Sequence, residues 1–228
     1  MRSLTIMMLA LLLTACASQP DKPFHFKNLA KSDIDMVADR HHQAISGLTR
    51  QLAIKLYKRN PRELAKANGV TLERRLKLLF PINRASRKHA ELAKRDSVAA
   101  VQLAFDPEFN GDRVFALMVG VTGMLNAAYN GQREFFLTDE LDQQKLYHSA
   151  RNLEVIAWQL RNKRGEDGKL LILSNGSTPE GIENLSYERL FGKMIALQDM
   201  LAQVVADKSS RAINRVVHSA ASMTLLPI

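Results

Sequence analysis

Apolar residues recur at intervals of three and four along most of the chain, and no stretch shows the sustained alternation typical of a half-buried strand. This spacing predicts an all-α protein. Ser32 followed three positions later by Asp35 matches the capping-box pattern that opens a helix. We therefore expect a first helix from Ser32 to about Lys58, whose buried stripe comprises Ile34, Val37, His41, Ile45, Leu48, Leu52 and Leu56.

Turn residues and helix caps divide the remaining chain into further helices. We expect helices over residues 61–68, 71–80, 83–105 with a break near 96, 112–129, 138–164, and from 187 towards 220 with a break near 208–211. Residues 169–174 are apolar and short, so we expect a strand or a helical turn there. The apolar residues 224–228 are expected to pack against the bundle. The pattern as a whole predicts a single bundle of about six to eight helices.

The segment 114–132 contains 19 residues without a charge, so it has to be distinguished from a membrane span. Asn126, Asn130 and Gln132 crowd its C-terminal end, which leaves about 12 to 15 apolar residues, the length of a buried core helix. Small residues also share one face of this segment, namely Ala116, Gly120, Gly123 and Ala127. Such a face lets a neighbouring helix approach closely. We expect this segment to be the central helix of a soluble bundle.

The N-terminus carries a different pattern. An arginine precedes an uncharged run over residues 3–15, which is too short to cross a bilayer as a mature helix and is typical of a cleaved signal peptide. The run ends in Leu13-Thr14-Ala15-Cys16, an apolar residue and two small residues before the only cysteine of the chain. This arrangement resembles the lipobox of bacterial lipoproteins. The resemblance implies that signal peptidase II cuts before Cys16 and that the Cys16 sulfur carries diacylglycerol.

This resemblance divides the chain into three parts: a signal peptide over residues 1–15, a lipidated N-terminus and flexible tether over 16–31, and an all-α, periplasm-facing domain over 32–228. A cysteine that carries more than one acyl chain holds a protein stably on a membrane. Ala17 stands where an aspartate tends to retain lipoproteins in the inner membrane. The expected location is the periplasmic leaflet of the outer membrane, with the inner membrane as the alternative.

Composition supports a globular body behind the tether. The chain has 228 residues, of which 46% are apolar and 24% are charged. These values exclude a disordered tail, a disulfide-stapled miniprotein and a polytopic membrane protein, because each of those classes has a distinct composition.

Motifs of known chemistry are missing from the sequence: there is no glycine-rich phosphate loop, no His-Glu-x-x-His, no EF-hand loop and no nucleophile elbow. We therefore expect no enzyme activity and no cofactor other than the lipid on Cys16. Asp35, Asp39 and His42 are spaced to share one helix face and could offer two carboxylates and an imidazole to a metal. The alternative is an ordinary solvated acidic face. His41 lies about 100° around the same helix and is expected to be packed.

The excess of basic residues is local. The formal net charge is +9, and residues 55–95 alone carry 13 basic and three acidic side chains. A concentrated basic face attracts anions, and the available anions in a bacterial envelope are phospholipid headgroups, lipopolysaccharide phosphates and acidic proteins. The candidate anion- or partner-binding residues are Arg84, Arg87, Lys88, Lys94 and Arg95.

These observations lead to three hypotheses about function. The first is a non-enzymatic helical binding or accessory module of an envelope assembly for transport, secretion or surface biogenesis, which would contact the membrane through its anchor and an envelope protein as partner. The second is a binder of anionic envelope lipid or lipopolysaccharide through the basic residues 55–95. The third is a metal-dependent enzyme that uses Asp35, Asp39 and His42. Nucleic acid is not an expected partner at this location.

Overall fold

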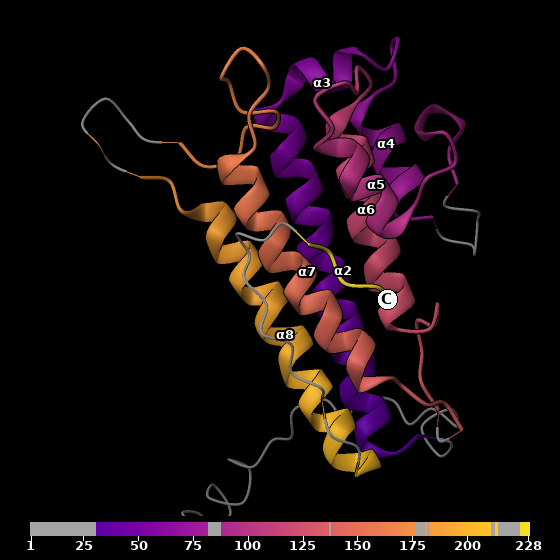
Figure 1. Cartoon of the computed structure of the whole chain (residues 1–228). Helices are drawn as coiled ribbons and strands as arrows, with labels where there is room; N and C mark the ends of the chain where they lie inside the picture. Colours follow the sequence, from indigo (N-terminus) through magenta and orange to yellow (C-terminus); the bar gives the residue numbers. More distant parts are fainter. Residues whose placement is uncertain are drawn as a thin grey trace, which may run out of the picture.

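The computed structural model describes residues 31–81, 88–136, 138–176, 181, 183–210, 213 and 224–228. Within these ranges the protein has seven α-helices, a short 3-10 helix and one isolated β-bridge (Figure 1). This confirms the predicted all-α bundle of six to eight helices.

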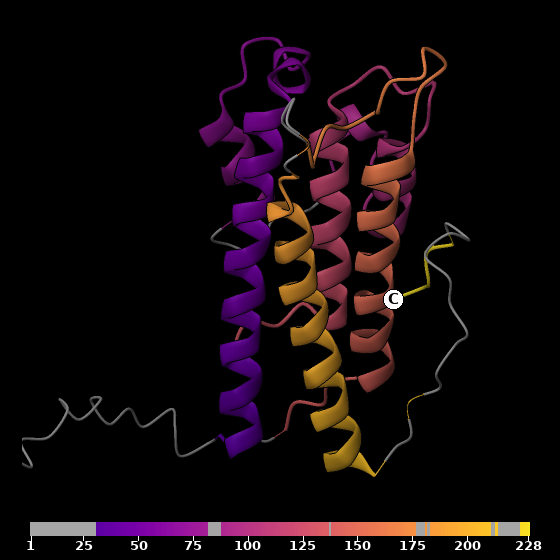
Figure 2. The same ribbon diagram turned by 90° about the vertical axis from the view of Figure 1, so that its left-hand side faces the viewer.

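Four long helices form an antiparallel bundle (Figures 1 and 2): α2 (Asp33–Arg59), α6 (Arg113–Ala128), α7 (Gln143–Asn162) and α8 (Ser186–Ser209). Each long helix contacts the next, and α8 returns to contact α2, so the four close into a ring. Tyr57, near the end of α2, donates a hydrogen bond to Asp112 just before α6. Lys208 at the end of α8 lies 3.7 Å from Asp35 at the start of α2. Neighbouring helices α2 and α6, and α2 and α8, therefore run in opposite directions.

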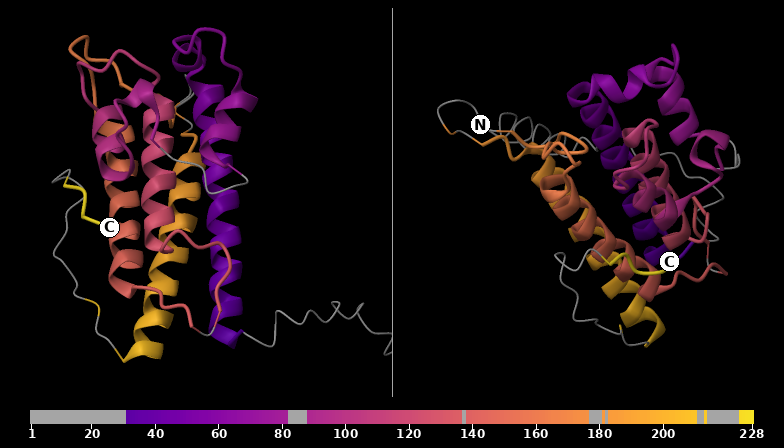
Figure 3. Two further views of the ribbon diagram at one scale, coloured as in Figure 1. Left: turned by 90° about the vertical axis from the view of Figure 1, so that its right-hand side faces the viewer. Right: turned by 45° about the horizontal axis from the view of Figure 1, so that its top comes forward.

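Three shorter helices connect α2 to α6 and pack against α6 (Figures 1 and 3): α3 (Pro61–Ala65), α4 (Leu72–Leu79) and α5 (Ser97–Ala104). Together with α2 and α7 they enclose α6, and 14 of its 16 residues are buried. Within the described ranges, none of the helices combines the length and the apolarity that crossing a membrane requires.

The small-residue face of α6 allows α5 to pack closely against it, as predicted. A Cβ atom added at Gly120 would lie 2.4 Å from Val101 Cγ2 and 2.8 Å from the carbonyl oxygen of Ser97. One added at Gly123 would lie 2.8 Å from the backbone nitrogen of Ser97. Because there is no room for a side chain at either glycine, the packing of α5 on α6 depends on both.

Helix starts follow the local capping chemistry of the sequence. Ser32 and Asp35 form the predicted capping box at α2, and the Thr71 hydroxyl accepts a hydrogen bond from the Arg74 amide at α4. Asp112 Oδ1 accepts a hydrogen bond from the Phe115 amide at α6. These side chains satisfy backbone donors that have no partner within the helix.

Three local predictions differ from the structure. The expected helix over 83–105 is instead, in its described part, the 3-10 helix η2 (Ala90–Leu92) followed by α5, because Ala93 and Lys94 adopt left-handed backbone angles between them. The break expected near residue 96 is confirmed. The helix expected from 138 begins only at Gln143, because Asp142 caps it. Residues 169–174 form neither a strand nor a helix. The break expected near 208–211 is confirmed, because α8 ends at Ser209, and the expected continuation toward 220 lies almost entirely outside the described residues.

The C-terminal residues 224–228 lie against the bundle, as expected. The buried side chain of Asn152 on α7 donates to the Leu226 carbonyl at 2.9 Å and accepts from the Leu226 amide at 2.6 Å. Leu225 and Ile228 pack against the core beside this contact. The paired hydrogen bonds fix the position of the C-terminal segment on α7.

Candidate functional site

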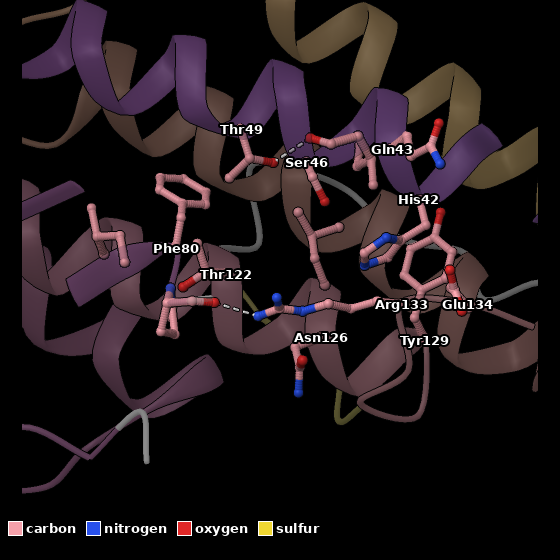
Figure 4. A pocket seen from close by; sticks show the side chains of 14 residues that line it. His42, Gln43, Ser46, Thr49, Phe80, Thr122, Asn126, Tyr129, Arg133 and Glu134 are labelled. Carbon is pink, nitrogen blue, oxygen red and sulfur yellow. Dashed lines mark hydrogen bonds between the residues drawn. The ribbon is translucent and has the colours of Figure 1, made fainter. Parts of the chain in front are cut away.

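A pocket of about 510 Å³ lies between α2 and α6 (Figure 4). Side chains one helical turn apart form its two walls: His42, Ser46 and Thr49 from α2, and Thr122 and Asn126 from α6 with Tyr129 at the C-terminal cap of that helix. The end of α4 and the loop after α6 complete the lining with Phe80, Pro81, Arg133 and Glu134. Two facing helices of a bundle normally meet through apolar side chains, so this polar lining is a departure from the packing pattern.

The pocket has a buried floor and an exposed rim. Thr49 and Thr122 are buried, together with the apolar side chains of Ile45, Leu79 and Leu125 that lie beside them. Ser46 and Asn126 are half-buried, whereas Gln43, Arg133 and Glu134 are exposed. A concave site with an apolar base and a few convergent polar groups is the usual form of a small-molecule site.

The two threonine hydroxyls are already committed as donors. Thr49 Oγ1 donates to the Ile45 carbonyl at 2.7 Å, and Thr122 Oγ1 donates to the Val119 carbonyl at 3.2 Å. A hydroxyl has one proton but two lone pairs. Each threonine oxygen can therefore still accept a hydrogen bond from a group in the pocket.

Tyr129 joins the pocket to the centre of the bundle. Its ring meets His42 edge to face, with a centroid separation of 5.0 Å, and His42 also contacts the Phe135 ring. Its hydroxyl donates to Gln198 Oε1 at 2.8 Å, and Gln198 Nε2 donates to the Ser149 hydroxyl at 2.6 Å. Burial raises the pKa of Tyr129 well above its ordinary value. The tyrosine is thus a neutral, fixed wall of the pocket.

Arg133 is the cation of the pocket lining. Figure 4 shows its side chain lying along the pocket, and Nη2 donates to the Pro81 carbonyl at 2.5 Å. The guanidinium carries five N–H donors in a planar fork and no acceptor. Glu134 lies next to it at the rim.

The predicted face of Asp35, Asp39 and His42 does not converge on one point. Asp35 caps α2 and lines a second cavity of about 200 Å³, where Lys208 lies near it. Asp39 pairs with Lys31 and accepts a hydrogen bond from the Phe135 amide. Only His42 of the three lines the larger pocket. Among the described residues, no group of three or more His, Cys, Asp and Glu side chains is arranged to hold a metal ion.

The two neighbouring histidines of α2 contact different parts of the bundle, as their spacing predicts. His41 is half-buried, and its Nδ1 lies 3.2 Å from the Leu197 carbonyl of α8. His42 faces α6 and the pocket. The pair is therefore not one site.

Only part of the basic segment, residues 55–95, lies within the described residues. Arg84 and Arg87 lie outside the described residues, and Lys88, Lys94 and Arg95 are exposed around η2. All three acidic side chains of residues 55–95 pair with basic ones of the same segment, in Glu63–Lys66, Glu73–Lys77 and Glu91–Arg75. Part of the counted positive charge is therefore compensated locally.

Arg75 belongs to the fold and not to the basic surface. It is 1% exposed, its two terminal nitrogens donate to both Glu91 oxygens at 2.6 and 2.7 Å, and its Nε lies 3.2 Å from Asp112 Oδ2. Its guanidinium lies over the Phe115 ring at 3.9 Å. Tyr57 donates to the same Asp112 oxygen, and burial together with this carboxylate raises the pKa of Tyr57. Burial also raises the pKa of Asp112.

The spacing of residues on single helices does not predict the pocket, although His42 is one of its lining residues. The polar positions of α2 continue the same face by one and two turns, to Ser46 and Thr49. In α6, Thr122 and Asn126 interrupt an otherwise apolar helix at the same spacing. These two interruptions were the available signal. Comparison of the chain with protein-family models, with curated proteins and with solved structures gives no match.

Proposed function

We propose that the chain is a lipid-anchored binding module of the bacterial envelope that takes a ligand into the pocket between α2 and α6. The observation that carries this proposal is the set of polar side chains at positions where two bundle helices face each other. Polar groups at such positions weaken the packing of the two helices, and a role in binding a ligand accounts for their presence. Hydroxyl, amide, imidazole and guanidinium groups around one cavity are groups that bind and orient a ligand.

The anchor and the location are part of the same proposal. Cys16 and residues 17–30 of the tether lie outside the described residues, and the support for lipidation is the motif Leu13-Thr14-Ala15-Cys16. Palmitate fed to cells that express the full-length chain should label it, and Cys16→Ser should remove the label and release the protein from the outer-membrane fraction. A Cys16→Ser chain that remains in the membrane fraction would contradict this anchor.

Mass spectrometry of the intact folded protein tests the pocket. The full-length chain is purified from membranes in mild detergent, beside a Ser46→Trp variant in which the indole fills the cavity. A Gln102→Trp variant, which adds the same bulk at an exposed position of α5, is the matched control. We expect a bound mass on the wild type and on the Gln102→Trp variant that is lost with Ser46→Trp. The same bound mass on all three proteins would exclude the pocket as its site.

A second candidate function rests on the exposure of Lys88, Lys94 and Arg95, and we propose it as the alternative: binding of anionic lipid through this surface. Such binding would fall steeply with salt, because exposed charges are screened. Replacing the three residues with Glu should then abolish sedimentation with vesicles that contain phosphatidylglycerol. Unchanged sedimentation at high salt would contradict this alternative.

A further inference from the structure

The chemistry of the pocket lining specifies what kind of ligand it accepts. We infer that the pocket binds a small acid that carries hydroxyl or amide N–H groups beside its carboxylate or phosphate, with Arg133 as the residue that holds the acid. This inference rests on the proposed binding function and adds the ligand class to it.

Arg133 supplies the requirement for an acid. Its guanidinium lies along the cavity (Figure 4), where it donates to the Pro81 carbonyl at 2.5 Å. A carbonyl accepts through one neutral oxygen, whereas a carboxylate or phosphate presents two charged oxygens to the planar fork of donors. An acid in the pocket is therefore a stronger acceptor for Arg133 than the Pro81 carbonyl is.

The walls supply the requirement for hydrogen-bond donors on the ligand. Because the Thr49 and Thr122 hydroxyls donate to backbone carbonyls of their own helices, their oxygens can act only as acceptors toward the cavity. Ser46 and Asn126 lie between them and the rim and add a hydroxyl and an amide. A ligand that bonds to the two threonine oxygens must carry O–H or N–H groups of its own.

The lining and the volume of the pocket favour a small ligand. Among the described residues that line it, Arg133 is the only Lys or Arg side chain, and Glu134 stands beside it. The cavity volume of about 510 Å³ lies in the lower half of the range typical of small-molecule sites.

Ligand-observed saturation-transfer NMR with the full-length lipidated protein in detergent micelles tests the inference. The probes are glucuronate and glucose 6-phosphate, which combine an acid with hydroxyls, glucose, which lacks the acid, propionate, which lacks the hydroxyls, and glucosamine, which is cationic. We expect saturable binding of glucuronate, glucose 6-phosphate or both, at least tenfold stronger than that of the other three. Comparison of these two probes tells a carboxylate preference from a phosphate preference.

Variants assign the binding to residues. Arg133→Gln should weaken binding of the acid probes at least tenfold and leave glucose unchanged, and Arg133→Lys should restore part of the loss. Arg161→Gln, at an exposed arginine of α7, is the matched control and should have no effect. Ser46→Trp should remove all binding, which places it in the pocket.

The outcomes distinguish a failure of the inferred ligand class from a failure of the proposed binding function. If glucose or glucosamine binds best, or if Arg133→Gln changes nothing while Ser46→Trp abolishes binding, the ligand class is wrong and the binding function stands. If no probe binds and the purified protein carries no mass that Ser46→Trp removes, both are wrong. Acid binding that depends on Arg133 and on the open pocket supports both.

Discussion

Substituting Gly120 by alanine adds a single methyl group at the closest approach between α5 and α6. That methyl would lie 2.4 Å from Val101 Cγ2 and 2.8 Å from both the Ser97 carbonyl oxygen and the Val101 amide nitrogen. Two of the three atoms belong to the backbone of α5, so a side-chain rotation cannot relieve the contact. The two helices must move apart, and the side chains packed between them lose contact.

Two opposing effects set the magnitude. Alanine favours a helix over glycine by about 1 kcal/mol, because the glycine backbone loses more freedom on folding. Adding a methyl group to a packed core costs about 1–3 kcal/mol when the surroundings have to shift. Since the clash here is with backbone, we expect the upper part of that range. The net loss in the free energy of unfolding should be about 1–2 kcal/mol.

Gly47 and Gly192 are matched controls for this substitution. Both lie inside long helices, α2 and α8, and a Cβ atom added at either one meets nothing within 4 Å. Each alanine substitution there should stabilise the protein by about 0.5–1 kcal/mol. Urea denaturation followed by far-ultraviolet circular dichroism, on chains produced without their first 16 residues, measures all three variants against the parent chain.

The gap between Gly120→Ala and the two controls should be about 1.5–3 kcal/mol, or a difference in Tm of about 3–12 °C in a chain of this length. The slopes of the urea transitions should agree, so that the difference reports stability. A Gly120→Ala variant that is as stable as the controls would refute the close packing of α5 on α6.

Three further perturbations test other parts of the fold. Arg75→Ala leaves the buried Asp112 carboxylate without its cation and should cost about 3–5 kcal/mol, whereas Lys77→Ala breaks a fully exposed, solvent-screened pair and should leave the urea midpoint nearly unchanged. Burial raises the pKa values of Tyr57 and Tyr129, so above pH 10 the unfolded chain loses phenol protons that the folded chain keeps. The stability contributed by these tyrosines is fully present below pH 10, and the free energy of unfolding should fall above it by about 1.4 kcal/mol per pH unit for each tyrosine. A flat urea midpoint up to pH 11 would contradict this expectation. Removal of residues 224–228 breaks the paired hydrogen bonds to α7 and should cost about 1–3 kcal/mol, and an unchanged urea midpoint would show that this segment does not stabilise the bundle.

Much of the fold follows from local sequence chemistry. Ser32, Thr71 and Asp112 start helices because their side chains satisfy backbone donors next to them in the sequence. Gly120 and Gly123 reveal a close helix contact because their spacing places them on one face. The sequence pattern does not predict the left-handed backbone angles at residues 93–94, which end η2.

The pocket could not be predicted in the same way, because it requires two faces from distant parts of the chain. Asp39 and His42 share a face of α2, yet Asp39 binds the backbone amide of Phe135 and His42 packs on Tyr129. Spacing on one helix tells which residues point together, and the neighbouring elements decide what each one contacts. Arg133 lies in a loop without helical periodicity, so nothing in the pattern placed it near α2.

Photo-crosslinking in living cells tests the proposed pocket most directly. A benzophenone amino acid is placed at Gln43 on the pocket rim or at Gln203, an exposed position of α8, in the full-length lipidated chain. We predict a discrete adduct of small mass at Gln43 that is missing at Gln203 and that disappears when Ser46→Trp is added to the same chain. Identical adducts at both positions, or an adduct at Gln43 that persists when the pocket is filled, would contradict the account.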